Sequence, residues 1–224
     1  FATPAFDNWE AERKAEAEQA QQAFDRRAKL AGTVFDCRIL SDDVENAALI
    51  FSEIARNYDI AVVAQAQPDD GLPETLAVES TLFDSGRPVV VVPYIQTEGI
   101  NLNRVVVCWD GSRNAARAVG DALPLLKRAK KIDVVTVEHK EQREVLKGAQ
   151  IAEHLARHKL DVDLKSIVAP EGDVANVILS QAADCGADLL VMGGYGHTRI
   201  REFVLGGATR GILGSMTVPV LMAH

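Results

Sequence analysis

The stretch from 192 to 209 contains the residues of this chain that are best suited to bind a ligand. It reads MGGYGHTRIREFVLGGAT, with Gly193 and Gly196 at the end of an apolar run and the pair Gly206 and Gly207 further on. Glycine permits positive φ and close backbone approach, so glycines between a strand and a helix can direct several N–H groups at an anion. The spacing therefore predicts a phosphate-binding loop.

A second candidate is Asp110, which follows the apolar run 105–109 and precedes the turn Gly111-Ser112. The carboxyl ends of the strands in a parallel α/β sheet meet at one edge, so we expect Asp110 and Gly193 to face the same crevice. An aspartate there can accept hydrogen bonds from a ribose hydroxyl or a base N–H. The alternative is that Asp110 or Ser112 only caps the following helix.

Composition and charge narrow the class of ligand. The 224 residues are 47% hydrophobic, as in a folded protein with a core, and the net charge of −8 argues against nucleic-acid binding. Residues 1–99 hold 8 basic and 18 acidic side chains, a net charge of −10, whereas residues 100–224 hold 16 and 14, a net charge of +2. An anionic ligand would prefer the second part, where Arg199, Arg201 and Arg210 lie near the glycines.

Apolar runs and cysteine spacing predict a cytoplasmic protein with no membrane partner. No run approaches the roughly 18 apolar residues of a membrane helix, and the first ten residues lack the pattern of a secretory signal. Cys37, Cys108 and Cys185 form no CxxC pair and no paired framework, which favours reduced thiols.

Strand-length apolar runs alternate with helical patterns, which is typical of βαβ units and a parallel sheet. In the second part we expect strands at 105–109, 132–138, 162–168, 188–192 and 218–222. The helices expected between them cover 114–129, 141–158, 173–185 and 199–213.

The first part repeats the later portion of this plan. In this first part we expect a helix at 7–30, a strand at 34–40, a helix at 44–57, and strands at 60–64 and 89–92. Arg87-Pro88-Val89 aligns with Val218-Pro219-Val220, a repeat of about 130 residues, which divides the chain into domains 1–98 and 99–224. Because the first copy has no counterpart of the strand at 105–109 and no initiator methionine, we expect it to lack an N-terminal segment of roughly 50 residues.

The two copies also differ in chemistry. The first has Ala64, Gln67, Pro68 and Asp69 at the positions that hold Gly193, Gly196, His197 and Thr198 in the second. An acidic side chain and a proline without an N–H suit a phosphate poorly. The sequence therefore predicts a degenerate, structural first domain.

With these residues in view, the chain resembles the universal stress protein family, UspA-like, in its tandem two-domain form. The resemblance lies in VVVCWDGS at 105–112, EGD at 171–173, the glycine spacing and TVPVLM at 217–222. ATP-binding members of that family carry Gly, two residues, Gly, nine residues, Gly, then Ser or Thr. Here Gly207 stands in place of the Ser or Thr.

The resemblance implies an α/β fold of two tandem, mainly parallel five-stranded-sheet domains, Rossmann-like and similar to adenine nucleotide alpha hydrolases. The domains would pack as an intrachain pseudo-dimer through their apolar final strands, and two chains could form a homodimer. By position, the implied nucleotide-binding residues are Cys108, Trp109, Asp110, Val137, Met192, Gly193, Gly196, Gly206, Gly207, Ala208 and Thr209.

The expected function is a stress-response protein that binds ATP, ADP or AMP, with or without Mg²⁺, in domain 99–224 and acts as a sensor or interaction module. The missing hydroxyl at Gly207 removes one phosphate hydrogen bond, worth about 0.5–1.5 kcal/mol. Two alternatives are a dimeric scaffold that binds no nucleotide and a slow ATPase. The sequence shows neither a general base partnered with His197 nor paired metal carboxylates, so we assign no catalytic residue and no metal ligand.

Overall fold

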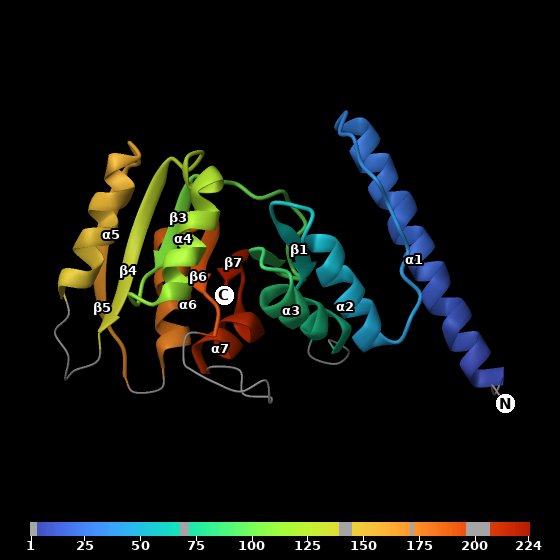
Figure 1. The fold of residues 1–224 in the computed structure, drawn as a ribbon. Helices are drawn as coiled ribbons and strands as arrows, with labels where there is room; N and C mark the ends of the chain where they lie inside the picture. The colour runs from blue at the N-terminus through green and yellow to red at the C-terminus, as the bar shows by residue number, and fades with distance from the viewer. Residues whose placement is uncertain (1–3, 68–71, 139–144, 171–172, 196–206) are drawn as a thin grey trace. The chain divides into compact units, whose positions relative to one another are not determined.

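The computed structural model describes residues 4–67, 72–138, 145–170, 173–195 and 207–224, and the chain divides into units 1–43 and 44–224 (Figure 1). No described helix is both long and apolar enough to cross a membrane. The elements are α1 (Pro4–Leu30), α2 (Val44–Ala55), β1 (Ala61–Ala64), α3 (Leu72–Asp84), β2 (Val89–Val92), β3 (Arg104–Cys108), α4 (Arg113–Leu126), β4 (Lys131–Glu138), α5 (Val145–Arg157), β5 (Val162–Val168), α6 (Val174–Cys185), β6 (Leu189–Gly193), α7 (Gly207–Ser215) and β7 (Val220–Ala223).

The unit 1–43 consists of α1 and the segment that follows it. The helix ends in a turn at Gly32, whose φ of 65° suits glycine, and the chain returns along α1 with Phe35 packed edge-on against Phe24 at 5.5 Å. The prediction of a strand at 34–40 is wrong, because these residues are neither strand nor helix. A strand needs a neighbouring strand for its backbone hydrogen bonds, and none of the described strands pairs with this segment.

The unit 44–224 is built on one seven-stranded sheet in the order β1-β2-β7-β6-β3-β4-β5. The five strands of the second copy are all parallel, as the sequence predicts, and β1 is parallel to β2. The last strands of the two copies meet in an antiparallel pair, with Val90 opposite Leu221. The prediction that these apolar strands form the meeting edge is therefore confirmed, and their pairing joins two short parallel sheets into one.

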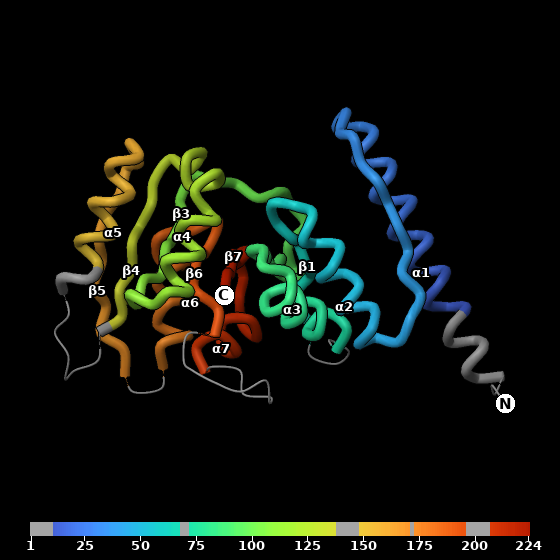
Figure 2. Tube along the Cα trace, viewed as in Figure 1, coloured from blue at the N-terminus to red at the C-terminus, as the bar shows by residue number. Residues whose placement is uncertain are grey.

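Helices cover both faces of this sheet (Figure 2). On one face, α4 and α5 pack over a cluster that includes Val107, Leu126 and Leu155; we call it the α4–α5 face. On the other, α3, α6 and α7 pack over a cluster that includes Val91, Val106 and Ile212; we call it the α3–α7 face. The sequence pattern gave no indication of α3, because its 13 residues lack a clear apolar stripe.

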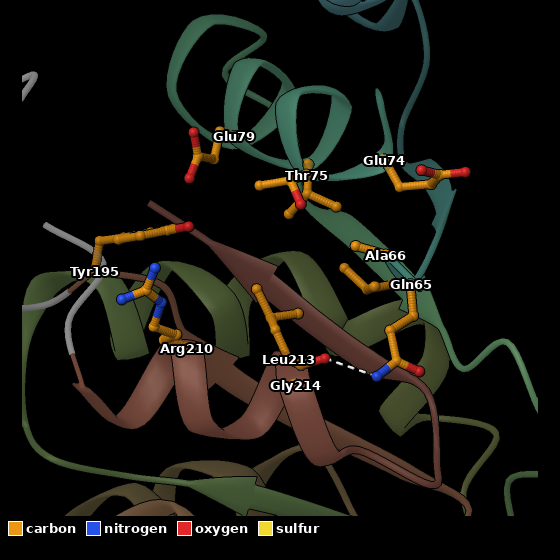
Figure 3. A pocket seen from close by; sticks show the side chains of 11 residues that line it. Gln65, Ala66, Glu74, Thr75, Glu79, Tyr195, Arg210, Leu213 and Gly214 are labelled. Atoms are coloured by element: carbon orange, nitrogen blue, oxygen red, sulfur yellow. Dashed lines mark hydrogen bonds between the residues drawn. The ribbon is translucent and has the colours of Figure 1, made fainter. Parts of the chain in front are cut away.

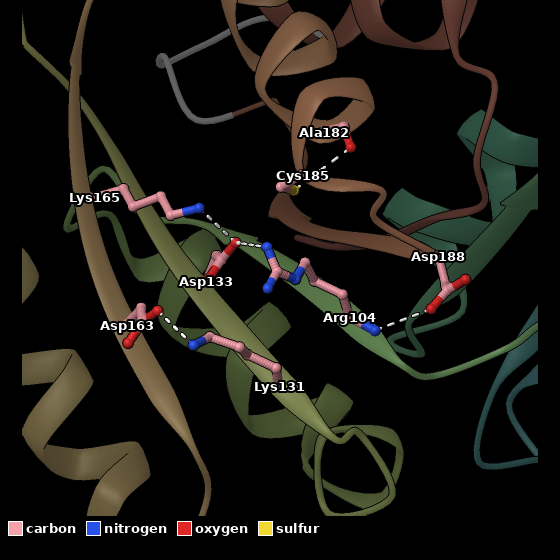
Figure 4. A network of polar contacts seen from close by, with 8 residues as sticks. All are labelled: Arg104, Lys131, Asp133, Asp163, Lys165, Ala182, Cys185 and Asp188. Carbon is pink, nitrogen blue, oxygen red and sulfur yellow. Dashed lines mark hydrogen bonds and ion pairs between the residues drawn. The ribbon is translucent and has the colours of Figure 1, made fainter.

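Charged side chains link neighbouring strands of the sheet from β6 to β5 (Figure 4). Asp133 on β4 is fully buried, and its Oδ2 lies 2.8 Å from Lys165 Nζ on β5 and 3.5 Å from Arg104 Nη1 on β3. Asp188, just before β6, accepts the backbone N–H groups of Asn103 and Arg104 at 2.7 and 2.9 Å. These bonds tie the amino ends of adjacent strands and fix the register of β3 against β4 and β6.

Asp133→Ala should destabilise the protein by about 3 kcal/mol, because it leaves two cations without their shared buried carboxylate. The matched control is Asp163→Ala on the neighbouring strand, whose carboxylate is half-exposed and pairs with Lys131 at 2.7 Å. We expect little change from this control, since exposed pairs are screened by water. Urea unfolding followed by circular dichroism measures both variants, and equal losses would contradict this account of Asp133.

Candidate functional site

The carboxyl ends of β6, β3 and β4 lie side by side at one edge of the sheet. The chain runs outward from β3 to β4 and β5 on one side, and from β6 to β7 on the other, so the topological switch point lies between β3 and β6. Ligands of open α/β sheets bind at such a point. The structure thus places Asp110 and Gly193 at the edge where the sequence predicts a binding site.

A tight turn presents Asp110 at this edge. Its Oδ1 accepts the backbone N–H of Ser112 at 2.8 Å, and Gly111 between them has a φ of 76°, which suits glycine. Ser112, not Asp110, is the N-cap of α4, since its Oγ accepts the N–H of Ala115 at 3.1 Å. Asp110 is exposed, so its second carboxylate oxygen can accept a hydrogen bond from a ligand.

The predicted residues of the strand ends separate onto the two faces of the sheet. Cys108, Val137 and Met192 all belong to the α3–α7 face, the face that α7 covers. Trp109 points to the opposite face, where it lines a cavity of about 380 Å³ together with Ile151 and other residues of α5. Three predicted residues therefore share a face with α7, and Trp109 does not.

Cys108 contributes an apolar surface and no thiolate. Burial raises the pKa of its thiol from 9.0 to about 12, and the negative charge of Asp110 acts in the same direction. The thiol is therefore protonated across the physiological range. A protonated thiol is suited to the apolar wall of a binding site, and it cannot act as a nucleophile at this position.

Gly193 allows the end of β6 to touch the start of α4. A Cβ at this position would lie 2.6 Å from the backbone nitrogen of Ala115 and 2.8 Å from the carbonyl carbon of Asn114. Neither backbone atom can move without displacing the first turn of α4. Gly193 thus has a packing role, because it lets the end of β6 lie against the first turn of α4, which follows the Asp110 turn.

Asn114 is a site residue that the sequence reasoning missed. Its side chain is buried, and its Nδ2 donates to Gly194 O at 2.6 Å and lies 2.9 Å from His224 Nδ1. The amide thereby holds the loop after β6 against α4. The sequence signal that could have identified Asn114 is its place as a polar residue directly before Ala115, on the buried face of an amphipathic helix.

The start of α7 holds the last three predicted residues, 207–209. Gly207 is exposed, Ala208 is half-buried, and Thr209 is buried with its Oγ1 accepting the N–H of Tyr195 at 3.4 Å. This bond ties the loop after β6 to α7. The remaining predicted residues, Gly196 and Gly206, lie outside the described residues, as do His197, Arg199 and Arg201.

The comparisons with known proteins agree with this geometry. The family model described as "Universal stress protein family" matches residues 101–224, which is more than half of the chain. The chain belongs to the universal stress protein family. The matched segment contains every strand end and helix start described above.

Two relatives illustrate the similarity. A universal stress protein of Synechocystis is 38% identical over 66 residues, which are 30% of this chain and 21% of that protein. The chain thus matches about a fifth of the length of this curated relative. A crystal structure of a universal stress protein from Archaeoglobus fulgidus superimposes with a TM-score of 0.72 at 18% identity, over all of this chain and 80% of its own. This likeness shows that the two proteins share a fold.

Substituting Gly193 by alanine should destabilise this universal stress protein by about 1–3 kcal/mol, because the new Cβ meets backbone atoms. Gly207→Ala is the matched control, since a Cβ there meets nothing within 4 Å. We expect the control to unfold at the wild-type temperature or slightly above it. Thermal unfolding by circular dichroism compares the two, and an unchanged transition in Gly193→Ala would contradict the packing role.

The raised pKa of Cys108 predicts slow modification of its thiol in the folded state. With Cys37 and Cys185 replaced by serine, iodoacetamide should label native Cys108 much more slowly at pH 9 than it labels the same protein in urea. Unfolding returns the pKa toward its ordinary value of 9.0, where about half of the thiol is ionised. Equal labelling rates in the two states would show that the thiol is neither buried nor shifted.

Proposed function

We propose that this chain binds an adenine nucleotide across the carboxyl ends of β6, β3 and β4, with its phosphates at the start of α7. The observation that supports this most strongly is that the Asp110 turn and Gly193 lie at the switch point, while the Tyr195–Thr209 bond ties the start of α7 to the residues after β6. Gly193 contributes to this arrangement by its contact with α4.

The start of α7 suits a phosphate. The first backbone N–H groups of a helix lack partners within the helix, and its dipole makes that end positive. The first turn of α7 contains no acidic side chain, and a Cβ added at Gly207 would meet no described atom within 4 Å, so the helix start itself leaves room for an anion. Gly206 and Gly207 are the sequence positions that would place a phosphate there.

The strand ends suit the nucleoside. Cys108, Val137 and Met192 share the face that α7 covers, and the uncharged thiol gives the base an apolar neighbour. The exposed carboxylate of Asp110 can accept a ribose hydroxyl or a base N–H. Mg²⁺, where it accompanies the nucleotide, would be held largely by the phosphates.

As a function, we propose a cytoplasmic stress-response protein in which nucleotide occupancy acts as a signal, read through an interaction surface. The free state of the three cysteines suits a reducing compartment. The first part of the chain serves a structural role, since its β2 extends the sheet from β7.

Calorimetric titration with ATP, ADP and AMP tests this proposal. We expect saturable binding of at least one nucleotide, and about three- to tenfold tighter binding of ATP by Gly207→Ser. The added hydroxyl restores one phosphate hydrogen bond, worth about 0.5–1.5 kcal/mol. Absence of both heat and thermal shift with all three nucleotides would overturn the proposal.

Asp110→Ala locates the site. The variant removes the carboxylate that would accept a hydrogen bond from the nucleotide, so we expect it to bind the nucleotide about tenfold more weakly, or worse. Asp163→Ala is the matched control, because Asp163 lies at the amino end of β5, away from the carboxyl edge. If both variants bind as the wild type does, the nucleotide lies elsewhere. Phosphate release measured in the same samples would reveal an ATPase.

A further inference from the structure

A cavity of about 220 Å³ lies between α3 and α7, over strand β2 (Figure 3). Val78 on α3, Val91 on β2 and Leu213 on α7 form its apolar walls. The volume is below the roughly 300–1,000 Å³ typical of pockets for drug-sized ligands. The cavity therefore fits a small metabolite.

Polar side chains line both ends of the cavity, and the three of interest lie together at one of them. Figure 3 shows Glu79, Tyr195 and Arg210 together at this end. Gln65, Ala66 and Glu74 lie at the other end. The hydroxyl of Tyr195 is buried and has no hydrogen-bond partner among the described residues. An unpaired buried hydroxyl is costly, so this group is suited to bond a ligand in the cavity.

The two charges at this end come from equivalent positions of the repeat. Glu79 lies as far before Pro88 as Arg210 lies before Pro219. Burial raises the pKa of the Glu79 carboxyl, while the positive charge of Arg210 opposes that shift. Within the described part of the chain, neither side chain forms a hydrogen bond or an ion pair. This end of the cavity thus presents one carboxylate and one guanidinium group to a ligand, while a second carboxylate, that of Glu74, lies at the opposite end.

Gln65 is not available in the same way. Its Nε2 donates to Leu213 O at 2.7 Å, and its Oε1 accepts the N–H of Tyr94 at 3.3 Å. Both ends of the amide are therefore used within the protein. Gln65 closes the far end of the cavity as part of its wall.

We propose that this cavity binds a small aliphatic zwitterion, the class to which free aliphatic α-amino acids belong. The ligand carboxylate would pair with Arg210 and the ammonium group with Glu79, while the Tyr195 hydroxyl bonds one of them. The aliphatic side chain would lie against Val78, Val91 and Leu213. Arg210 and Tyr195 lie next to the proposed phosphate end, whereas Glu79 on α3 does not. The test below uses no nucleotide, so its outcome is read separately from nucleotide binding.

The test is calorimetric titration of the whole chain with L-leucine, L-isoleucine and L-valine, alongside thermal unfolding. At least one should bind saturably and raise the unfolding temperature. 3-Methylbutylamine and 4-methylpentanoate each carry only one charge, and we expect them to bind about tenfold more weakly than leucine, or worse. Binding of either compound as tightly as leucine would overturn the assignment of a zwitterion.

Variants place the ligand in the cavity. Glu79→Gln keeps the shape of the side chain and should weaken binding by about tenfold, and Tyr195→Phe should weaken it by a smaller factor. Glu98→Gln, at an exposed position, is the matched control and should bind as the wild type does. Wild-type affinity in both Glu79→Gln and Tyr195→Phe, or no binding by any of the three amino acids, would overturn the proposal.

Discussion

The antiparallel pairing of β2 with β7 is the constraint on which the rest of unit 44–224 depends. Two apolar edge strands, one from each copy of the repeat, satisfy each other's backbone groups and bury Val89, Val91 and Met222 with almost no exposure. The same pairing places α3 beside α7 on one face of the sheet, so that Gln65 after β1 can reach the carbonyl of Leu213. Without this seam, neither the shared core nor the cavity between the two helices would exist.

A second constraint links this core to the proposed nucleotide site. Gly193 ends a buried strand and touches the first turn of α4, while Asn114 in that turn bonds the next carbonyl of the loop. Thr209 then ties Tyr195 to α7. Gly194 and Tyr195, the two described residues after β6, are therefore held from both sides by groups whose own positions are set by packing. A ligand that binds these two residues would lose less binding free energy in ordering them.

Much of this arrangement could be predicted from the sequence, because apolar runs and turn residues report it directly. The five parallel strands, the turn at Gly111 and the seam between the final strands follow from such local signals. The segment 34–40 misled the prediction, since a strand-like pattern forms a strand only where a partner strand exists. Asn114 was missed because its importance depends on a carbonyl 80 residues away along the chain. Trp109 lies toward the α4–α5 face because it follows Cys108, the last residue of β3. Residue spacing alone does not show at which residue β3 ends.

The helices on either side of the β2–β7 seam differ in the charge of their first turns. Helices α3 and α7 hold equivalent places beside the seam, yet the first turn of α3 contains Glu74 and that of α7 contains no acidic residue. An acidic side chain at a helix start occupies the position that favours an anion and repels a phosphate. The seam does not involve these helix starts, so substitutions there could alter ligand preference without weakening the pairing of β2 and β7. The packing surfaces that join β2 and β7 are thus physically separate from the helix starts at which α3 and α7 differ, so substitutions at the helix starts leave the seam intact.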